Sequence, residues 1–529
     1  MRNFLAGLRP SLWPLVVAGA LSLAYLISAP LTADHGAQLF RIGLVEADGP
    51  VIWNNHWFGG HHLPAYSVLS PLLGSWIGFR VMGVLSVLGS VLLFSLIVDR
   101  YWGDRARAGA IWFGAAACIS LYSGRLTFAL GVLIALFAVF LAQRGLRASS
   151  IVAAAFVALA SPVASLFLAC AGFSHWLAAA RGGDPADRRG LWLAVSAFLS
   201  AVAVALLFPA GGSGPYVWSS FIPAIVLTLA ALLVIPAGER LVRTGLAVYA
   251  VALVATFLLD TPMGGNVNRM GVLLIGPVLL CAGWPLSRRP ALVALLPFLL
   301  AWQVVPVIRD LTTVAGEEVV TASFYEPVIR ELGPKLEANP GRVEVLPVKS
   351  HWESARLAPG LTLARGWERQ SDRHLNGVIY DEGMTPAEYR QWLDELSVRF
   401  VAVPDAELDY SALREADLID AAPDFLEEVS RTPDWTIYRV IDPKPMVDPP
   451  ARLIGLGTDW FSVRSPRAGV FRVAIRWTRW WGVESGPGCL AERPDGFTTV
   501  EFDRPGRIEV VAAFRPLEVF GRSDRCPGR

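Results

Sequence analysis

The chain has 529 residues, 54% of them hydrophobic, and a formal net charge of +1. This net charge averages two unlike parts, because residues 1–310 hold 10 acidic and 19 basic residues whereas residues 311–529 hold 35 and 27. A mean hydropathy of +0.46 excludes a disordered chain and an ordinary soluble enzyme, since this much apolar surface requires lipid as its solvent. The basic residues form no single patch interleaved with aromatic residues, so we expect no nucleic-acid partner.

Eleven apolar segments are predicted to cross a membrane as helices. Each has about 20 residues or somewhat fewer, the length that spans ~30 Å of hydrocarbon. The first is not a cleaved signal peptide, because it lacks a small-residue cleavage site and many further spans follow it. The segments are 11–31, 80–98, 108–124, 127–143, 150–161, 163–180, 191–209, 220–236, 244–259, 270–286 and 291–307. Residues 1–310 are therefore predicted to form a polytopic α-helical membrane domain.

Ser161-Pro162 is the least certain point in this topology. Proline lacks an amide donor and restricts the residue before it, so we expect a break between two short helices. A single tilted helix over 150–180 is the alternative, and it would reverse the side on which every later segment lies.

Arginines sort between the spans by side. Five fall on one side: Arg41, Arg80, Arg125, Arg269 and Arg309. Fourteen fall on the other: Arg2, Arg9, Arg100, Arg105, Arg107, Arg144, Arg147, Arg181, Arg188, Arg189, Arg240, Arg243, Arg288 and Arg289. The positive-inside rule makes the arginine-rich side cytoplasmic. We therefore expect a cytoplasmic N-terminus and an extracytoplasmic C-terminal domain.

The first exterior loop, residues 32–79, is too long and too aromatic for a plain connector. We expect its amphipathic parts to lie along the outer membrane interface, with tryptophan at headgroup level. Asp34, at the end of the first span, is a candidate general base, with capping of the following helix as the alternative. The adjacent His35 is a second catalytic candidate, with simple solvation as its alternative. His61 and His62 are candidate substrate contacts, and simple solvation is the alternative for them. No acid at i,i+4 spacing supports metal binding by these histidines, so we expect no metal site.

Two further segments carry candidate residues. In residues 260–269, Arg269 suits the phosphate of a lipid carrier, or alternatively snorkels to the interface, and Asn266 lies in the same turn. Arg41 and Arg125 are weaker candidates of the same kind. In residues 365–374 the planar, charged and amide side chains, including Trp367, Glu368 and Arg369, suit sugar hydroxyls; a solvated loop is the alternative.

The exterior third is predicted to hold an α/β region over 311–445 and a β-sandwich-like region over 446–529. Thr385 and Glu388 form a capping box at a helix start, and 398–404 and 436–440 have strand patterns. Alternating runs separated by glycine and proline follow from about residue 450. Cys489 and Cys526 are disulfide candidates, whereas the three cysteines in apolar spans, Cys118, Cys170 and Cys281, are expected to be packing residues.

The chain resembles the GT-C superfamily of membrane glycosyltransferases. The resemblance is carried by Asp34-His35 opening the first exterior loop, the stretch from Gly49-Pro50 to Pro64, and the Ser70-Pro71-Leu72 helix entry. Within that superfamily, the chain most resembles the bacterial pyruvoyl-tetrahydropterin-synthase-related membrane domain and YfhO-like group. The resemblance implies a polyprenyl-phosphate sugar as donor, an inverting transfer, Asp34 as base and Arg269 as phosphate contact. Asp34 stands in no DxD pair, so we expect a metal-independent enzyme without a cofactor.

The sequence therefore predicts an enzyme of the bacterial plasma membrane that glycosylates an envelope glycan, lipid or protein and that also contacts membrane lipid. A transporter or flippase of lipid-linked sugar is one alternative, although the spans show no detectable inverted repeat and few polar residues at mid-membrane. A non-catalytic membrane scaffold is the other alternative.

The topology gives a first prediction. Of two reporters fused after residue 445, only the one that works outside the cytoplasm should be active. The opposite topology would place the fourteen arginines outside the cytoplasm, against the positive-inside rule. Paired fusions of alkaline phosphatase and a fluorescent protein that matures only in the cytoplasm would measure this. Fluorescence without phosphatase activity would overturn the topology.

Overall fold

The computed structural model of the chain describes residues 11–184, 187–282, 289–358, 360–516 and 525–526. It divides into two compact units. The helical unit comprises residues 1–35, 64–209 and 213–315; the mixed unit comprises residues 36–63, 210–212 and 316–529. Arg2, Arg9 and Arg288, and the end of the segment predicted over 270–286, lie outside the described residues.

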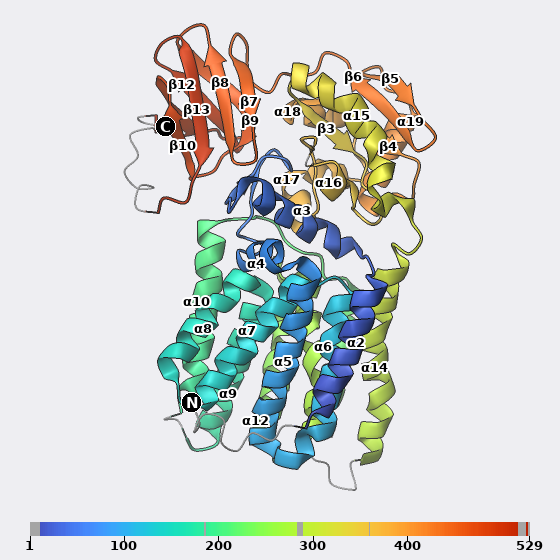
Figure 1. Cartoon of the computed structure of the whole chain (residues 1–529), viewed down its shortest axis with the longest axis vertical. Helices are drawn as coiled ribbons and strands as arrows, with labels where there is room; N and C mark the ends of the chain where they lie inside the picture. Colours follow the sequence, from blue (N-terminus) through green and yellow to red (C-terminus); the bar gives the residue numbers. More distant parts are fainter. Residues whose placement is uncertain (1–10, 185–186, 283–288, 359, 517–524, 527–529) are drawn as a thin grey trace. The chain divides into compact units, whose positions relative to one another are not determined.

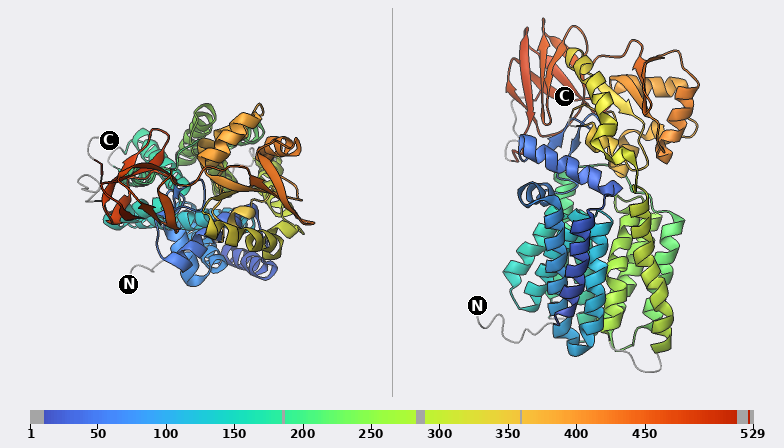
Figure 2. Two further views of the ribbon diagram at one scale, coloured as in Figure 1. Left: turned by 90° about the horizontal axis from the view of Figure 1, so that it is seen from above. Right: turned by 45° about the vertical axis from the view of Figure 1, so that its right-hand side comes forward.

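Helices make up the helical unit, and they run side by side in Figures 1 and 2. They are α2 (Trp13–Ser28), α4 (Leu69–Ile77), α5 (Phe79–Trp102), η1 (Gly103–Ala106), α6 (Arg107–Tyr122), α7 (Leu126–Gln143), α8 (Arg147–Ala160), α9 (Pro162–Arg181), α10 (Arg189–Leu207), α11 (Trp218–Val234), α12 (Arg240–Leu258), η2 (Gly264–Val267), α13 (Asn268–Cys281) and α14 (Arg289–Thr312). Helix α3 (Ala33–Asp48) begins in the helical unit and continues in the mixed unit. Each of the eleven apolar segments thus coincides with a helix.

Fewer of these helices have the length and apolar composition of a membrane span. Among the residues that the structure describes, seven helical stretches do so, or eight if the pair α2 and α3, bent by 77°, is one broken span. Helices α8 and α11 are shorter, with 14 and 17 residues, and 14 residues reach only about 21 Å. Residues 79–122 form one helical stretch of 44 residues, within which α5 and α6 pack against each other. The chain is compatible with a multi-pass membrane protein, but the count of eleven spans is not confirmed.

The predicted break at Ser161-Pro162 is present. Ser161 has extended backbone angles, φ −157° and ψ 112°, and its hydroxyl caps α9 by accepting a hydrogen bond from the amide of Ala164 at 3.4 Å. Pro162 occupies the start of α9, where its missing amide costs nothing. Glycines let neighbouring helices approach: a Cβ on Gly172 of α9 would lie 2.6 Å from the carbonyl oxygen of Gly190 in α10.

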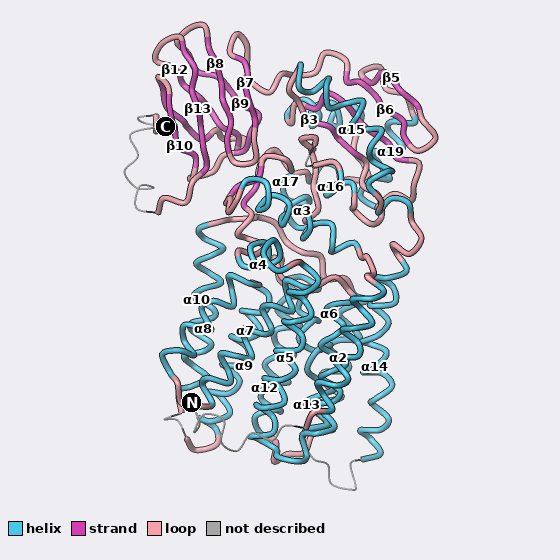
Figure 3. The backbone as a smooth tube through the Cα atoms, viewed as in Figure 1, coloured by secondary structure: helices cyan, strands magenta, loops and turns pink. Residues whose placement is uncertain are grey.

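The first part of the mixed unit is a four-stranded sheet of order β3-β4-β6-β5 with helices packed on it (Figure 3). Its strands are β3 (Arg342–Val345), β4 (Val398–Pro404), β5 (Leu426–Arg431) and β6 (Trp435–Val440), and only β3 and β4 are parallel. Its helices include α15 (Ala322–Ala338), α16 (Glu353–Arg356), α17 (Arg369–Leu375), α18 (Pro386–Glu395) and α19 (Leu413–Asp420). Helix α18 begins with the predicted capping box of Thr385 and Glu388.

The C-terminal part is a pair of antiparallel sheets around one hydrophobic core. The sheets have the orders β10-β13-β8-β7 and β11-β12-β9. The strands are β7 (Arg452–Leu456), β8 (Trp460–Ser465), β9 (Gly469–Arg476), β10 (Trp481–Ser485), β11 (Gly488–Glu492), β12 (Phe497–Phe502) and β13 (Gly506–Ala512). Phe461 and Trp481 from one sheet pack with Val473 and Val500 from the other, as the sandwich pattern predicts.

Two tryptophans of the first exterior loop, Trp53 and Trp57, are buried in protein and so do not lie at headgroup level. Strand β1 (Trp53–Asn54) pairs with β2 (His61–His62) inside the mixed unit, where Trp53 is 2% exposed and Trp57 is fully buried. The Trp57 indole donates to the carbonyl oxygen of Ser354 at 3.0 Å, and a Cβ on Gly366 would lie 2.5 Å from its ring. The interfacial placement was wrong for these two indoles, because protein groups supply the apolar contacts and the hydrogen-bond acceptors that a bilayer interface would otherwise offer.

Cys489 and Cys526 form the expected disulfide, which links two residues 37 positions apart in the sequence. Replacing Cys489 by Ser should lower the free energy of unfolding of the sandwich by about 2–4 kcal/mol, because the unfolded chain regains the entropy of an open loop. Amide hydrogen exchange of β11 and β12 in the full-length protein measures this loss. Reductant should destabilise the wild type and leave the Cys489→Ser variant unchanged; equal exchange in both proteins would contradict the prediction.

Candidate functional site

Asp34 lies in a cluster of charged side chains at one end of the helical unit. The Arg125 guanidinium contacts two carboxylates, Asp310 at 3.1 Å from Nη2 and Asp34 at 3.8 Å from Nε. Arg309 lies 3.6 Å from the other oxygen of Asp310. The three side chains nearest the centre are partly shielded, with exposures of 38% for Asp34, 22% for Arg125 and 20% for Asp310. Segments far apart in sequence thus bring two acids to one arginine.

A glycine turn sets the distance between these segments. Gly124, between α6 and α7, has φ +71°, a conformation that other residues adopt only under strain. A Cβ there would lie 2.1 Å from the Thr32 hydroxyl and 3.3 Å from the Asp34 Cβ. Arg125 follows directly as the residue before α7, so the close approach of Gly124 brings its side chain to Asp34.

Arg269 belongs to the same cluster. It is the second residue of α13, lies within electrostatic range of Asp34, Asp310 and Arg125, and its guanidinium carbon is 5.6 Å from the centre of the Phe128 ring. The preceding turn η2 holds Asn266. The predicted phosphate contacts Arg125 and Arg269 are therefore brought together with the predicted base.

His35 is placed beside Asp34 but is buried, with 1% exposure. Its Nδ1 accepts a hydrogen bond from the amide of Thr32 at 3.0 Å, and its ring meets the Phe79 ring edge to face at 5.3 Å. Because an amide can only donate, Nδ1 carries no proton in this geometry and the ring is neutral. This arrangement supports a positioning role for His35 at the turn before α3.

Arg41 and Glu368 meet each other in the mixed unit. They form an ion pair, and Arg41 also donates to the carbonyl oxygen of Ala37 at 2.8 Å and lies over the Trp57 ring. His61 stacks on Trp57 at 5.7 Å, and burial holds its pKa well below the ordinary value. These three predicted residues are thus part of one buried aromatic and charged contact around Trp57.

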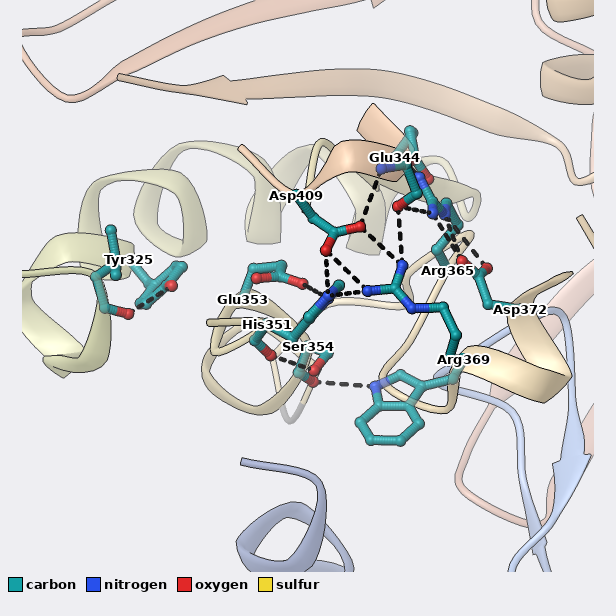
Figure 4. A network of polar contacts seen from close by, with 12 residues as sticks. Tyr325, Glu344, His351, Glu353, Ser354, Arg365, Arg369, Asp372 and Asp409 are labelled. Carbon is teal, nitrogen blue, oxygen red and sulfur yellow. Dashed lines mark hydrogen bonds and ion pairs between the residues drawn. The ribbon is translucent and has the colours of Figure 1, made fainter. Parts of the chain in front are cut away.

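The other predicted contacts of the mixed unit have local partners. His62 exchanges a hydrogen bond with the Thr478 hydroxyl at 2.8 Å. Arg369 makes a two-pronged pair with Asp409, at 2.7 and 2.8 Å (Figure 4). Trp367 stacks on His351, with 3.7 Å between the ring centres. One face of the Trp367 indole is therefore covered by protein.

His351 lies between two carboxylates, Asp409 at 3.3 Å from Nε2 and Glu353 at 3.4 Å from Nδ1 (Figure 4). Burial alone would lower the pKa of His351, but the two carboxylates outweigh it and raise the pKa. Burial would raise the pKa of Asp409, but the hydrogen bonds and positive charges of His351 and Arg369 outweigh it and lower the pKa. The backbone of His351 has φ +56°, so this tightly paired histidine also sits in a strained turn.

A second buried group surrounds Arg365. It pairs with Asp372 at 2.7 Å, and its Nη1 lies 3.8 Å from Glu344 and 3.6 Å from Glu415, both fully buried. Burial raises the pKa of Glu344 well above the ordinary value, and the neighbouring Glu415 raises it further. Burial also raises the pKa of Glu415 to about 7, against the opposing effect of Arg365. One arginine thus neutralises Asp372, while the two glutamates tend to hold protons.

A small cavity adjoins both buried groups. Its volume is about 10 Å³, and it is lined by His351, Glu353, Arg365 and Asp372 among others. A polar space of this size holds about one water molecule, so it is too small for a sugar.

Metal binding has one geometric candidate among the described residues. Cys489, Cys526 and Glu501 bring their ligand atoms within 4.8 Å of one another. The two sulfurs are joined as a disulfide, so they offer no thiolate to a metal. These residues therefore do not fit a metal ion.

Comparison with known proteins adds no family to this picture. No protein-family model matches the sequence, and no curated protein matches it. The resemblance to GT-C enzymes is therefore an expectation from the residues of the first exterior loop alone.

The buried glutamates give a pH prediction. A carboxyl whose folded pKa is raised makes the folded state bind more protons than the unfolded state, so stability falls as pH rises from about 4.5 to about 7. Glu415→Gln removes this proton site and can still accept the Tyr389 hydroxyl, which lies 2.7 Å from Glu415. As pH rises from 5 to 8, the wild type should lose stability that the variant keeps. The difference between their free energies of unfolding should change by ~1–3 kcal/mol in favour of the variant.

Hydrogen exchange of the β4 amides measures that free energy in the full-length protein. Glu407→Gln is the matched control, because Glu407 is 66% exposed and pairs only with Lys349 among the ion pairs of the described chain. Parallel pH curves for wild type and Glu415→Gln would contradict the prediction.

Proposed function

We propose that the protein is a GT-C-type glycosyltransferase of the bacterial plasma membrane, with the mixed unit and the Asp34 end of the helical unit outside the cytoplasm. It transfers a sugar from a polyprenyl-phosphate donor to a hydroxyl of an envelope glycan, lipid or protein. The observation that carries this proposal is the meeting of Asp34, Arg125, Arg269 and Asp310 at one end of the helical unit. A general base and phosphate-binding cations are the two requirements of sugar transfer from a phosphate leaving group.

The chemistry assigns a different task to each charge. Asp34 takes the proton of the acceptor hydroxyl as its oxygen attacks the anomeric carbon. The bond from that carbon to the phosphate oxygen breaks, and the phosphate leaves with the electron pair. Arg269 and Arg125 stabilise the negative charge that gathers on the leaving phosphate, as planar guanidinium groups do well. Attack from the face opposite the phosphate inverts the anomeric centre.

The donor also needs a place for its lipid tail. Helix α14 ends near Asp310, and its side chains Phe298, Val305 and Ile308 are 64%, 60% and 54% exposed. Exposed apolar side chains on a membrane helix are suited to contact with hydrocarbon. A polyprenyl chain lying along α14 would bring its phosphate to the charged cluster at the end of the same helix.

A transporter would need polar residues along a path through the helices, and a scaffold would need no base at all. Asp34→Asn separates the enzyme from both. The amide keeps the size of the side chain and its capacity to accept hydrogen bonds, but it cannot take a proton. We expect normal folding and a loss of transfer of ~10²–10⁴-fold, the usual effect of removing a general base.

The measurement is incorporation of labelled sugar by membranes supplied with a panel of polyprenyl-phosphate sugars. Asp260→Asn is the matched control, since Asp260 is an exposed acid in another exterior loop of the predicted topology, and it should retain wild-type transfer. Wild-type transfer by Asp34→Asn would assign Asp34 to the structure of the turn alone. Failure of wild-type membranes to transfer any of the sugars would refute the choice of donor.

A further inference from the structure

A large open cavity lies at the opposite end of the helical unit from Asp34. Its volume is about 550 Å³, within the range of small-molecule sites, and its wall includes Gly145, Arg147, Arg188, Arg189 and Trp192. Helix α7 separates the two ends: Arg125 directly precedes its first residue and Gly145 lies two residues beyond its last, so its 18 residues place them about 27 Å apart. This cavity is therefore distinct from the proposed catalytic cluster.

The cavity wall has more positive than negative charge. Three arginines face two acids, Asp184 and Asp187. Asp187 is already committed, because it accepts a two-pronged contact from Arg189 at 2.8 and 2.6 Å. Arg147 and Arg188 are exposed to solvent at this wall. The charges left to meet a ligand are thus mainly cationic.

The start of α8 adds to this positive character. Helix α8 begins at Arg147 without a side-chain cap, whereas the first amide of α10, that of Arg189, already donates to the Asp187 carboxylate at 3.1 Å. The first amides of a helix lack intrahelical partners and carry the positive end of its dipole, so the start of α8 favours an anion. Trp192, one turn into α10, holds the Arg147 guanidinium 4.3 Å from its ring centre. Cationic side chains, helix amides and an indole therefore surround one cavity.

The surface beside the cavity is apolar. On α10, Val195 and Leu199 follow Trp192 at helical spacing and are 41% and 58% exposed; on α8, Val152 and Phe156 are 56% and 48% exposed. Helices α8 and α10 pack against each other, so these side chains continue from the cavity along neighbouring helices. An anion-binding cavity joined to an exposed apolar surface matches a molecule with a phosphate head and hydrocarbon chains.

We propose that this cavity binds the phosphate of an anionic phospholipid, with Arg147, Arg188 and the start of α8 contacting the headgroup and the exposed side chains of α8 and α10 contacting the acyl chains. The proposal is independent of glycosyl transfer. Free inorganic phosphate offers the same anion chemistry without the chains, so the two sources differ in whether the apolar surface contributes to binding.

Native mass spectrometry of the full-length protein, titrated with phosphatidylglycerol, tests the proposal. The double variant Arg147→Gln/Arg188→Gln should weaken binding of this lipid by about tenfold or more, because it removes two charge-assisted contacts. Arg105→Gln/Arg107→Gln is the matched control: it removes the same charge at the same end of the helices but not from the cavity wall, and it should change binding less than about twofold.

Two further arms distinguish the sources. Phosphatidylcholine should bind more weakly than phosphatidylglycerol, and inorganic phosphate at ten times the lipid concentration should leave the lipid bound. Displacement by phosphate at that ratio would overturn the lipid assignment, and equal lipid binding by the double variant and wild type would overturn the site. If the double variant is unstable, Arg188→Gln alone serves, because Arg188 is exposed and precedes α10; unchanged lipid binding by it would count against the site.

Discussion

A guanidinium held among apolar helix ends must meet carboxylates, and this requirement organises the Asp34 end of the helical unit. Arg125, which is 22% exposed, contacts Asp34 from the start of α3 and Asp310 from the end of α14. Removing one partner of a shielded ion pair costs more than the pair contributes, because the remaining charge stays poorly solvated. The turn at Gly124 adds a steric condition, since no side chain fits between it and Thr32. The positions of three distant segments therefore depend on one arginine and one glycine.

In the mixed unit, buried or partly buried arginines are likewise paired with carboxylates. Arg365 pairs with Asp372, Arg369 with Asp409, and Arg41 with Glu368. The last of these pairs explains why residues 36–63 belong to this unit although they separate two apolar helices in sequence. Asn55 adds hydrogen bonds to the carbonyl oxygens of Gly457 and Trp460 at 2.8 and 3.3 Å. This loop is therefore joined both to the α/β part and to the sandwich.

Local patterns in the sequence predicted the elements well. The capping box at Thr385, the helix break at Ser161 and the strand over 398–404 each depend on neighbouring residues, so short windows reveal them. The disulfide was a candidate because only two cysteines lie in the exterior third, although sequence could not show that they meet. The count of eleven spans is not confirmed, because apolar composition alone does not distinguish a 14-residue helix from one that crosses the bilayer.

Long-range contacts were beyond the sequence. Asp34, Arg125 and Arg269 were each singled out, but nothing in their spacing placed them together or pointed to Asp310 as the second acid. The buried glutamates were missed for a different reason: in Arg342–Val345, strict alternation assigns Arg342 and Glu344 to a solvent face, yet all four side chains are buried. An acid between two valines in a short strand is the signal that could have raised Glu344 as a candidate.

The two acids around Arg125 are not equivalent, and this difference bears on the proposed chemistry. Asp310 has the shorter contact with Arg125 and an additional neighbour in Arg309, and its side chain is only 20% exposed. Asp34 has the longer contact, at 3.8 Å, and is 38% exposed. Asp310 is thus suited to hold Arg125, whereas an acceptor hydroxyl reaches Asp34 more easily. With Arg269 and Arg309 included, three arginines face two acids, so a phosphate group entering the cluster would bring its charge close to neutrality. Arg309 is 73% exposed, so water also solvates its charge, whereas a phosphate in the cluster would be drawn to the partly buried guanidinium groups of Arg125 and Arg269.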